Sequence, residues 1–394
     1  MQSHSLKPGD TLGLIGGGQL GRMFTQAAGQ MGFRVAVLDP DPDCPAAQVG
    51  ARPIVGRWDN RETLARLASI TNVITVEFEN IPARSLFYLE KLGATCRPGW
   101  RGLWVSQNRI REKRFLARLG CPLPRWCEIS HELQLKQAET TVGFPLILKT
   151  ASEGYDGKGQ TKVESAVKLP AAWESLGRRP CVAESIVPFQ AELSIIIGRD
   201  QFGHTACHGP MWNHHTHHIL DWSLFPSPFG PIITREAIEI ARSVVKALDH
   251  VGLMTVELFL TNDGSLIVNE LAPRPHNSGH WTIEGSPTSQ FAQQARILAG
   301  WSVGETYTDT PACMANLLGD VWANGEPDWA ATLAADQGVQ LHLYGKSSPK
   351  PGRKMGHLTT VDTDPAQARA RVIHARNLLS GRGSDSCKTS SHTS

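Results

Sequence analysis

Two acidic residues, Glu257 and Glu270, give the clearest chemical signal in the sequence, because they lie in the two arms of a predicted hairpin, LMTVELFL-TNDG-SLIVNEL. With Asp263-Gly264 as a two-residue turn, which favours type I′ geometry, the glutamates lie directly opposite each other. A turn at 262–263 keeps them on one face, whereas a three-residue loop separates them. Facing carboxylates repel unless a cation lies between them, and hard oxygen ligands suit Mg²⁺ bridging nucleotide phosphates. The alternative is a solvated pair on an exposed face, which the apolar neighbours disfavour.

The loop after Glu270 is rich in donors suited to anions, with Arg274, His276 and Asn277 bracketed by prolines. A second cation, Lys149, ends an apolar strand and precedes the glycine-rich segment 154–159. That segment is not a Walker A loop, because it lacks four residues between its glycines and a Ser or Thr after the lysine. It is predicted to be a flexible lid over phosphates, with a plain hairpin turn as the alternative.

Two other motifs invite hypotheses that the surrounding residues weaken. Gly16–Gly21 fits GxGxxG between a strand and a helix, with Asp39 at the end of the next strand, as in dinucleotide sites. On its own this motif is weak evidence for a dinucleotide site, and a tight turn without a ligand is the alternative. A nicotinamide dehydrogenase would also need a hydride-transfer site, and the sequence shows no convincing one. The histidine run 213–218 suggests zinc, but adjacent residues of an extended segment point to opposite faces and cysteine ligands are absent. A nucleotide contact or a surface loop is the favoured interpretation.

The elements that must position these residues follow from hydrophobic periodicity. The first hundred residues alternate strands and helices, which predicts a parallel sheet covered on both faces. A charged helix leads into a small α+β unit, which is followed by a strand, a long helix, the hairpin and another helix. The predicted strands cover 11–17, 34–39, 72–78, 145–149, 180–185, 192–200 and 339–346, and the helices cover 19–31, 61–70, 81–92, 106–119, 166–176, 231–251 and 287–300.

Composition limits the function classes. A chain of 394 residues predicts two or three domains, and a formal charge of +2 gives no field that would favour nucleic acid or membrane partners. The eight cysteines include no CxxC pair, and the chain has neither an apolar leader nor a membrane-spanning run. We therefore expect a reduced, cytoplasmic protein without a disulfide framework.

Four strings in order, GGGQLGRM, VEFENIP, GYDGKGQ and VELFL…NELAPRPHNSGHW, resemble the 5-(carboxyamino)imidazole ribonucleotide synthases, which are ATP-grasp enzymes, and the likeness runs from about residue 11 to residue 360. The resemblance implies that ATP phosphorylates bicarbonate to carboxyphosphate and that the amine of 5-aminoimidazole ribonucleotide takes the carboxyl group. Formate-dependent glycinamide ribonucleotide transformylase is the nearest rival, and a non-enzymatic nucleotide-binding module would bind ATP without turnover. The family is usually homodimeric.

The same resemblance implies an α/β ATP-grasp fold with a Rossmann-like parallel-sheet domain first. The expected parts are this domain over 1–106, a linker helix and α+β lid over 107–185, a central antiparallel-sheet domain over 186–300, a small C-terminal β-rich domain over 301–380 and a disordered tail over 381–394.

Site residues carried over from the family fall into four groups. Glu257 and Glu270 would bind Mg²⁺. The expected catalytic residues are Asp156, which would accept the proton of the amine, Arg274, which would hold carboxyphosphate, and His276; all three also belong to the family's ribonucleotide site. The expected ATP contacts are Arg109, Lys149, Gly154, Gly157, Lys158, Gly159, Glu184, Val187, Glu192, His215 and Asn269. The expected ribonucleotide contacts are Gln19, Glu77, Asn80, Tyr155, Asn277, Lys346 and Arg353. Two departures stand out: Glu153 replaces a small residue, and Lys158 replaces an arginine and so lacks its bidentate fork.

Overall fold

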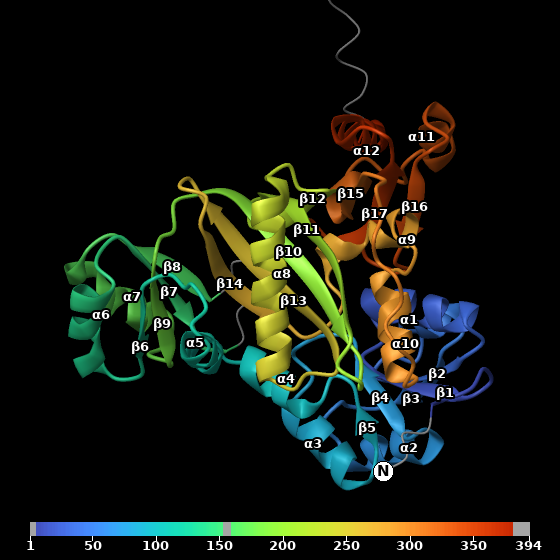
Figure 1. Cartoon of the computed structure of the whole chain (residues 1–394), viewed down its shortest axis with the longest axis horizontal. Helices are drawn as coiled ribbons and strands as arrows, with labels where there is room; N and C mark the ends of the chain where they lie inside the picture. The colour runs from blue at the N-terminus through green and yellow to red at the C-terminus, as the bar shows by residue number, and fades with distance from the viewer. Residues whose placement is uncertain (1–4, 153–158, 381–394) are drawn as a thin grey trace, which may run out of the picture.

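The computed structural model describes residues 5–152 and 159–380, and the strands in these ranges form sheets of five, four and eight strands (Figure 1). Gly154, Tyr155, Asp156, Gly157 and Lys158, and the tail expected over 381–394, lie outside the described residues. None of the described helices combines the length and apolar character needed to cross a bilayer.

The N-terminal sheet is parallel, in the order β3-β2-β1-β4-β5, as the alternation of strands and helices predicts. Apolar side chains of α1 cover one face, and those of α2 and α3 cover the other. The short strands β3 and β5 were not predicted. The elements are β1 (Thr11–Ile15), α1 (Gln19–Gln30), β2 (Arg34–Asp39), β3 (Arg52–Val55), α2 (Arg61–Ile70), β4 (Val73–Val76), α3 (Ala83–Lys91) and β5 (Thr95–Cys96).

The glycine-rich turn between β1 and α1 binds carboxylates of its own chain. The amide of Gly17 donates to Asp39 at 2.8 Å, and the amides of Gly18 and Leu20 donate to Glu77. A Cβ added at Gly18 would lie 2.3 Å from a carboxylate oxygen of Glu77, so a larger residue here would displace this carboxylate. Because two carboxylates already accept from the turn, the structure favours the tight-turn interpretation over a dinucleotide site.

The predicted helix over 106–119 corresponds to α5 (Arg109–Arg118), and the helix before it, α4 (Trp100–Ser106), was not predicted. Asn108 separates them because its extended backbone starts a new helix and its side chain accepts from the amide of Arg111. The four-stranded sheet that follows is antiparallel, in the order β6-β9-β7-β8, and packs against α6 and α7. Its elements are β6 (Trp126–Ile129), α6 (Leu135–Thr141), β7 (Leu146–Thr150), β8 (Gln160–Val163), α7 (Leu169–Ser175) and β9 (Cys181–Ser185).

The eight-stranded sheet is antiparallel, in the order β14-β13-β10-β11-β12-β15-β17-β16. Helix α8 covers one face of β10 and β13, whereas α10 lies between this sheet and α1, where it joins the N-terminal core (Figure 1). The elements are β10 (Phe189–Arg199), β11 (Thr205–Thr216), β12 (Ile219–Phe225), α8 (Gly230–Ala247), β13 (Gly252–Thr261), β14 (Leu266–Ala272), α9 (Thr282–Gly285), α10 (Gln290–Leu298), β15 (Ala312–Leu318), α11 (Trp329–Ala335), β16 (Gln340–Leu343), β17 (Lys354–Val361) and α12 (Pro365–Leu379).

The C-terminal strands differ from the expected arrangement. Strands β15, β17 and β16 continue the central sheet through β12, whose Trp222 pairs with Ala315, instead of forming a sheet of their own. The hairpin β11–β12 provides the edge that they extend, and this hairpin was missing from the prediction. Helices α11 and α12 add to this segment, which is therefore α+β in content rather than only β-rich.

Candidate active site

A cavity of about 950 Å³ lies where the three sheets approach one another, and it collects most of the predicted site residues. The glycine-rich turn, β7, β10, the β11–β12 hairpin, β13, β14 and the segment between β16 and β17 all contribute to its wall. The predicted residues that line it are Gln19, Glu77, Asn80, Arg109, Lys149, Glu192, His215, Glu257, Asn269, Glu270, Arg274, His276, Asn277 and Lys346. Gly159, Glu184, Val187 and Arg353 are described but are not part of its lining.

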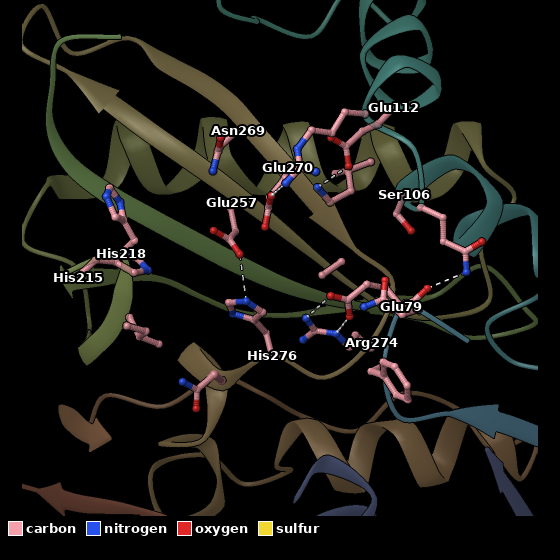
Figure 2. Close-up of a pocket in the computed structure, with 18 of the residues that line it drawn as sticks. Glu79, Ser106, Glu112, His215, His218, Glu257, Asn269, Glu270, Arg274 and His276 are labelled. Atoms are coloured by element: carbon pink, nitrogen blue, oxygen red, sulfur yellow. Dashed lines mark hydrogen bonds and ion pairs between the residues drawn. The ribbon is translucent and has the colours of Figure 1, made fainter. Parts of the chain in front are cut away.

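Glu257 on β13 and Glu270 on β14 are direct cross-strand partners, although the predicted turn is wrong. Thr261 pairs with Ser265, so the loop has three residues, 262–264, the length that was expected to separate the carboxylates. A β-bulge restores the pairing: Leu258 pairs with Val268 and Glu257 with Glu270, which leaves Asn269 as the extra residue on β14. Both carboxylates therefore project into one cavity (Figure 2).

The electrostatics of this pair suit a divalent cation. Burial raises the pKa of Glu270, and the nearby Glu257 raises it further, because two negative charges at close range repel. The side chain of Glu270 is 45% exposed, so it remains accessible from the cavity. The described residues form no cluster of three or more His, Cys, Asp or Glu suited to a metal, so a cation here needs additional oxygen ligands such as phosphates. Two carboxylates with the amide of Asn269 nearby fit Mg²⁺, which takes few protein ligands.

Arg274 and His276 approach this pair from the loop after β14 (Figure 2). Arg274 binds Glu79 through a two-point contact of Nε and Nη2. Burial opposes ionisation of Glu79, but the charge of Arg274 outweighs it and lowers the pKa of Glu79 to about 2. His276 Nε2 lies 3.0 Å from Glu257 Oε1, while its Nδ1 lies 2.8 Å from Ser278 Oγ, so both ring nitrogens are fixed.

The base of the loop is fixed by one glutamine. Gln290 on α10 accepts from the amide of His276 and donates to its carbonyl oxygen, both at 2.8 Å. Burial opposes ionisation of Glu257, but its contact with His276 lowers the pKa of Glu257, so this carboxylate stays charged. The loop thus presents a cation and an imidazole in a defined position beside the carboxylate pair.

Cationic side chains from the neighbouring elements complete this end of the cavity. Lys149 on β7 and Arg109 on α5 both line it, and Arg109 Nη2 lies 3.9 Å from Glu270 Oε2. Glu184, one of the expected ATP contacts, lies 2.8 Å from Lys149 and 3.1 Å from Lys113. These two lysines outweigh the effect of burial and lower the pKa of Glu184 to about 2.

The histidine run forms the tip of the β11–β12 hairpin. His214 points away and stacks on Trp222, with ring centroids 5.1 Å apart, while His217 and His218 occupy positive φ in the turn. His215 faces the cavity and places Nδ1 2.7 Å from Glu192 Oε2. Burial opposes protonation of His215, but Glu192 outweighs it and raises the pKa of the imidazole. The run is therefore split between two faces, as expected for an extended segment.

Another part of the cavity wall joins the start of α1 to the segment between β16 and β17. Lys346 Nζ donates to Gln19 Oε1 at 2.5 Å and to the Lys354 carbonyl oxygen at 2.7 Å. Burial lowers the pKa of Lys346 to about 8, and Arg353 adds to this effect. Asn277 is buried at the wall, and neither atom of its amide has a hydrogen-bond partner among the described residues. An unpaired buried amide that lines a cavity is suited to a ligand.

Comparison with known proteins assigns the family. The chain matches the ribonucleotide synthetase preATP-grasp domain over residues 10–107, the ATP-grasp domain over 114–291 and the phosphoribosylaminoimidazole carboxylase C-terminal domain over 312–371. It is 40% identical over 359 residues to N5-carboxyaminoimidazole ribonucleotide synthase of Bacillus subtilis, covering 91% of this chain and 93% of the relative. The chain belongs to the N5-carboxyaminoimidazole ribonucleotide synthase family. Its members are ATP-grasp ligases, and the predicted family and fold class are confirmed.

Solved structures of N5-carboxyaminoimidazole ribonucleotide synthases share the whole fold. The Staphylococcus aureus enzyme complexed with ADP superposes with a TM-score of 0.87 at 34% identity, over 94% of this chain and 98% of that one. The Aspergillus clavatus enzyme in complex with ADP and 5-aminoimidazole ribonucleotide superposes with a TM-score of 0.84 at 30% identity, over 94% and 99% of the two chains.

Several residues of the cavity were missed when the sequence was interpreted as a synthase. Glu79, Glu112 and Lys354 line the cavity, and Lys113 contacts the carbonyl oxygen of Asn269 directly behind it. Glu79 lies inside the quoted string VEFENIP, so its place in a motif could have signalled it. Glu112 and Lys113 lie on a charged helix, where acidic and basic residues normally face solvent, so their burial carried no sequence signal.

Proposed function

We propose that this chain uses ATP and bicarbonate to carboxylate 5-aminoimidazole ribonucleotide at its exocyclic amine. One observation carries the proposal: a single cavity joins the Glu257–Glu270 pair to the Lys346–Gln19 contact, with Arg274 also in its wall. Such a cavity can hold two anionic ligands, one at the carboxylate pair and one at the lysine. The relatives with ADP and with 5-aminoimidazole ribonucleotide support this division.

The ATP end is proposed to work by positioning and charge. Lys149 and Arg109 would contact the phosphates, and Glu192 would accept from the ribose hydroxyls. Glu257 and Glu270, with Asn269 beside them, would hold Mg²⁺, whose charge offsets the repulsion between ATP and bicarbonate. A bicarbonate oxygen takes the γ-phosphoryl group and ADP leaves, which gives carboxyphosphate.

The second step is proposed to take place beside Arg274 and His276. The guanidinium holds the carboxyphosphate, and the amine nitrogen attacks its carboxyl carbon while the carbon–oxygen bond to phosphate breaks and phosphate leaves. Asp156, outside the described residues, is proposed to accept the proton that the amine loses. Lys346 and Asn277 would hold the ribonucleotide, so that its amine is oriented toward the loop after β14.

The test is an ADP-release assay over a panel of acceptors. The proposal predicts release that requires bicarbonate and is strongly stimulated by 5-aminoimidazole ribonucleotide. Release with formate and glycinamide ribonucleotide instead would establish the transformylase alternative. Tight ATP binding without any turnover would identify a nucleotide-binding module and refute the proposal.

A further inference from the structure

We propose that Glu112 and Lys113 on α5 are positioning residues that hold the β-bulge of β14 and thereby aim Glu270 at Glu257. The inference rests on the proposed function in one respect, because it takes the two carboxylates to be the Mg²⁺ ligands. It assigns a role to two buried charged residues that touch neither the phosphates nor the ribonucleotide in that scheme.

The bulge decides which way Glu270 points. The two strands pair in regular register between the Leu260/Leu266 pair and the Leu258/Val268 pair. If that register continued, Glu257 would lie opposite Asn269. Glu270 would then lie opposite Val256. Side chains alternate between faces along a strand, so Glu270 would then enter the apolar core that Val256 shares with α8. The extra residue Asn269 shifts the register by one, and Leu271 takes the place opposite Val256.

Helix α5 holds this bulge on both sides of Glu270. Lys113 Nζ donates to the carbonyl oxygen of Asn269 at 3.1 Å, and Glu112 Oε2 accepts from the amide of Leu271 at 2.9 Å. β14 is the edge strand of its sheet and the bulge interrupts its ladder with β13, so its backbone groups that face α5 need other partners when they are buried. Glu112 and Lys113 provide those partners, one acceptor and one donor, for the two residues that flank the ligand.

Both contacts are buried, so water does not screen them as it screens an ion pair on the surface. Lys113 is 1% exposed and Glu112 is 2% exposed. Lys113 also contacts Glu184 on β9 at 3.1 Å, so its charge is compensated and its side chain is held between the two sheets. Figure 2 shows Glu112 extending from α5 toward the strand that carries Glu270. We infer that α5 orients Glu270 in the same way that outer partners orient metal ligands in other proteins.

Variants at Glu112 separate this role from a general effect on stability. Glu112→Gln keeps an oxygen that can accept from the amide of Leu271, Glu112→Asp shortens its reach by one methylene, and Glu112→Leu removes the acceptor. Arg114→Met is the matched control, because Arg114 lies on the same helix but pairs with Glu128 away from the bulge. The readout is the Mg²⁺ concentration that gives half-maximal ADP release, measured with the full chain.

The proposal predicts an increase of about tenfold or more in that concentration for Glu112→Leu, with a smaller increase for Glu112→Asp. Glu112→Gln and Arg114→Met should stay within twofold of the starting protein, as should the KM for 5-aminoimidazole ribonucleotide in all four variants. An unchanged Mg²⁺ requirement in Glu112→Asp and Glu112→Leu, with only a lower melting temperature, would overturn the proposal. If Glu112→Leu does not fold, the Mg²⁺ requirements of Glu112→Asp and Glu112→Gln are compared. A higher requirement in Glu112→Asp alone supports the proposal, and equal requirements overturn it.

A second measurement keeps this result separate from the proposed activity. Binding of Mn²⁺ in the presence of ADP, followed by electron paramagnetic resonance, requires no turnover. Weaker Mn²⁺ binding in Glu112→Leu than in Arg114→Met would show that the contact of Glu112 with the bulge positions the metal ligand, even if the acceptor substrate is a different one. Equal binding in the two variants contradicts the positioning role even if carboxylation is observed.

Discussion

Replacing Arg274 with lysine should slow the reaction strongly without removing the positive charge. Among the described residues, three of the five N–H groups of this guanidinium are engaged, two by Glu79 and one by the Pro275 carbonyl oxygen at 3.0 Å. Two remain to bind an anion. A lysine has three N–H groups in all and no planar fork, so it cannot keep the contacts to Glu79 and also present two donors.

The expected decrease in kcat/KM follows from the loss of one of the two hydrogen bonds that Arg274 can donate to the anion. One charge-assisted hydrogen bond contributes about 1.5–3 kcal/mol, which corresponds to roughly a 10- to 150-fold decrease in kcat/KM. Because carboxyphosphate exists only after the substrates have bound, kcat should fall by a similar factor while the KM for ATP stays nearly constant.

The assay is steady-state ADP release, with 5-aminoimidazole ribonucleotide varied at saturating ATP and then ATP varied at saturating 5-aminoimidazole ribonucleotide. Arg371→Lys is a matched control, because Arg371 on the C-terminal helix α12 makes an equivalent two-point contact with Asp336, which follows α11, away from the cavity. A value of kcat/KM for Arg274→Lys within threefold of the starting protein would refute the assignment of Arg274 to the intermediate.

Three further predictions follow from the charges in and around the cavity. Glu270→Gln should lower kcat at least about 100-fold, whereas urea unfolding of the ligand-free protein should show no loss of stability, because the change relieves repulsion from Glu257. Burial lowers the pKa of Lys346 to about 8, so the KM for the ribonucleotide should rise as the pH passes about 8. Lys346→Arg should move that rise to higher pH. A pH profile that does not change in this variant would exclude Lys346 as the phosphate contact. Burial lowers the pKa of His208 and of His250 to about 4. The unfolded state therefore binds more protons than the folded state below about pH 6.5. As the pH falls from 7 to 5, each histidine should lower the free energy of unfolding by about 2 kcal/mol. His208→Gln should reduce that loss in urea titrations, and an equal loss in the variant would contradict the assignment.

Local pattern predicted the N-terminal sheet except for β3 and β5, whereas most of the cavity residues were predicted from the resemblance to the family. The alternation of apolar strands with amphipathic helices predicted β1, α1, β2, α2, β4 and α3 to within a few residues. The glutamate pair followed from hairpin geometry, but by an incorrect route, since the loop has three residues and a bulge at Asn269 corrects the register. No residue type marks that bulge in the sequence, because the partners that hold it come from α5.

The parts that the sequence could not predict depend on contacts between distant segments. Arg274 and Glu79 are 195 residues apart, and Glu112 and Leu271 are 159 apart, so neither contact has a local signature. The ion pairs of Glu184 with Lys113 and Lys149 likewise join segments that are distant in the sequence. The β11–β12 hairpin was missed although Leu220, Trp222 and Leu224 alternate along β12 as a buried apolar face.

The central claim is that bicarbonate is phosphorylated beside Glu257 and Glu270, and oxygen transfer tests it most directly. With ¹⁸O-labelled bicarbonate, unlabelled ATP and 5-aminoimidazole ribonucleotide, the account predicts that one labelled oxygen appears in each inorganic phosphate released, as measured by the ³¹P isotope shift. Phosphate that carries no label while the carboxylated product accumulates would contradict the account.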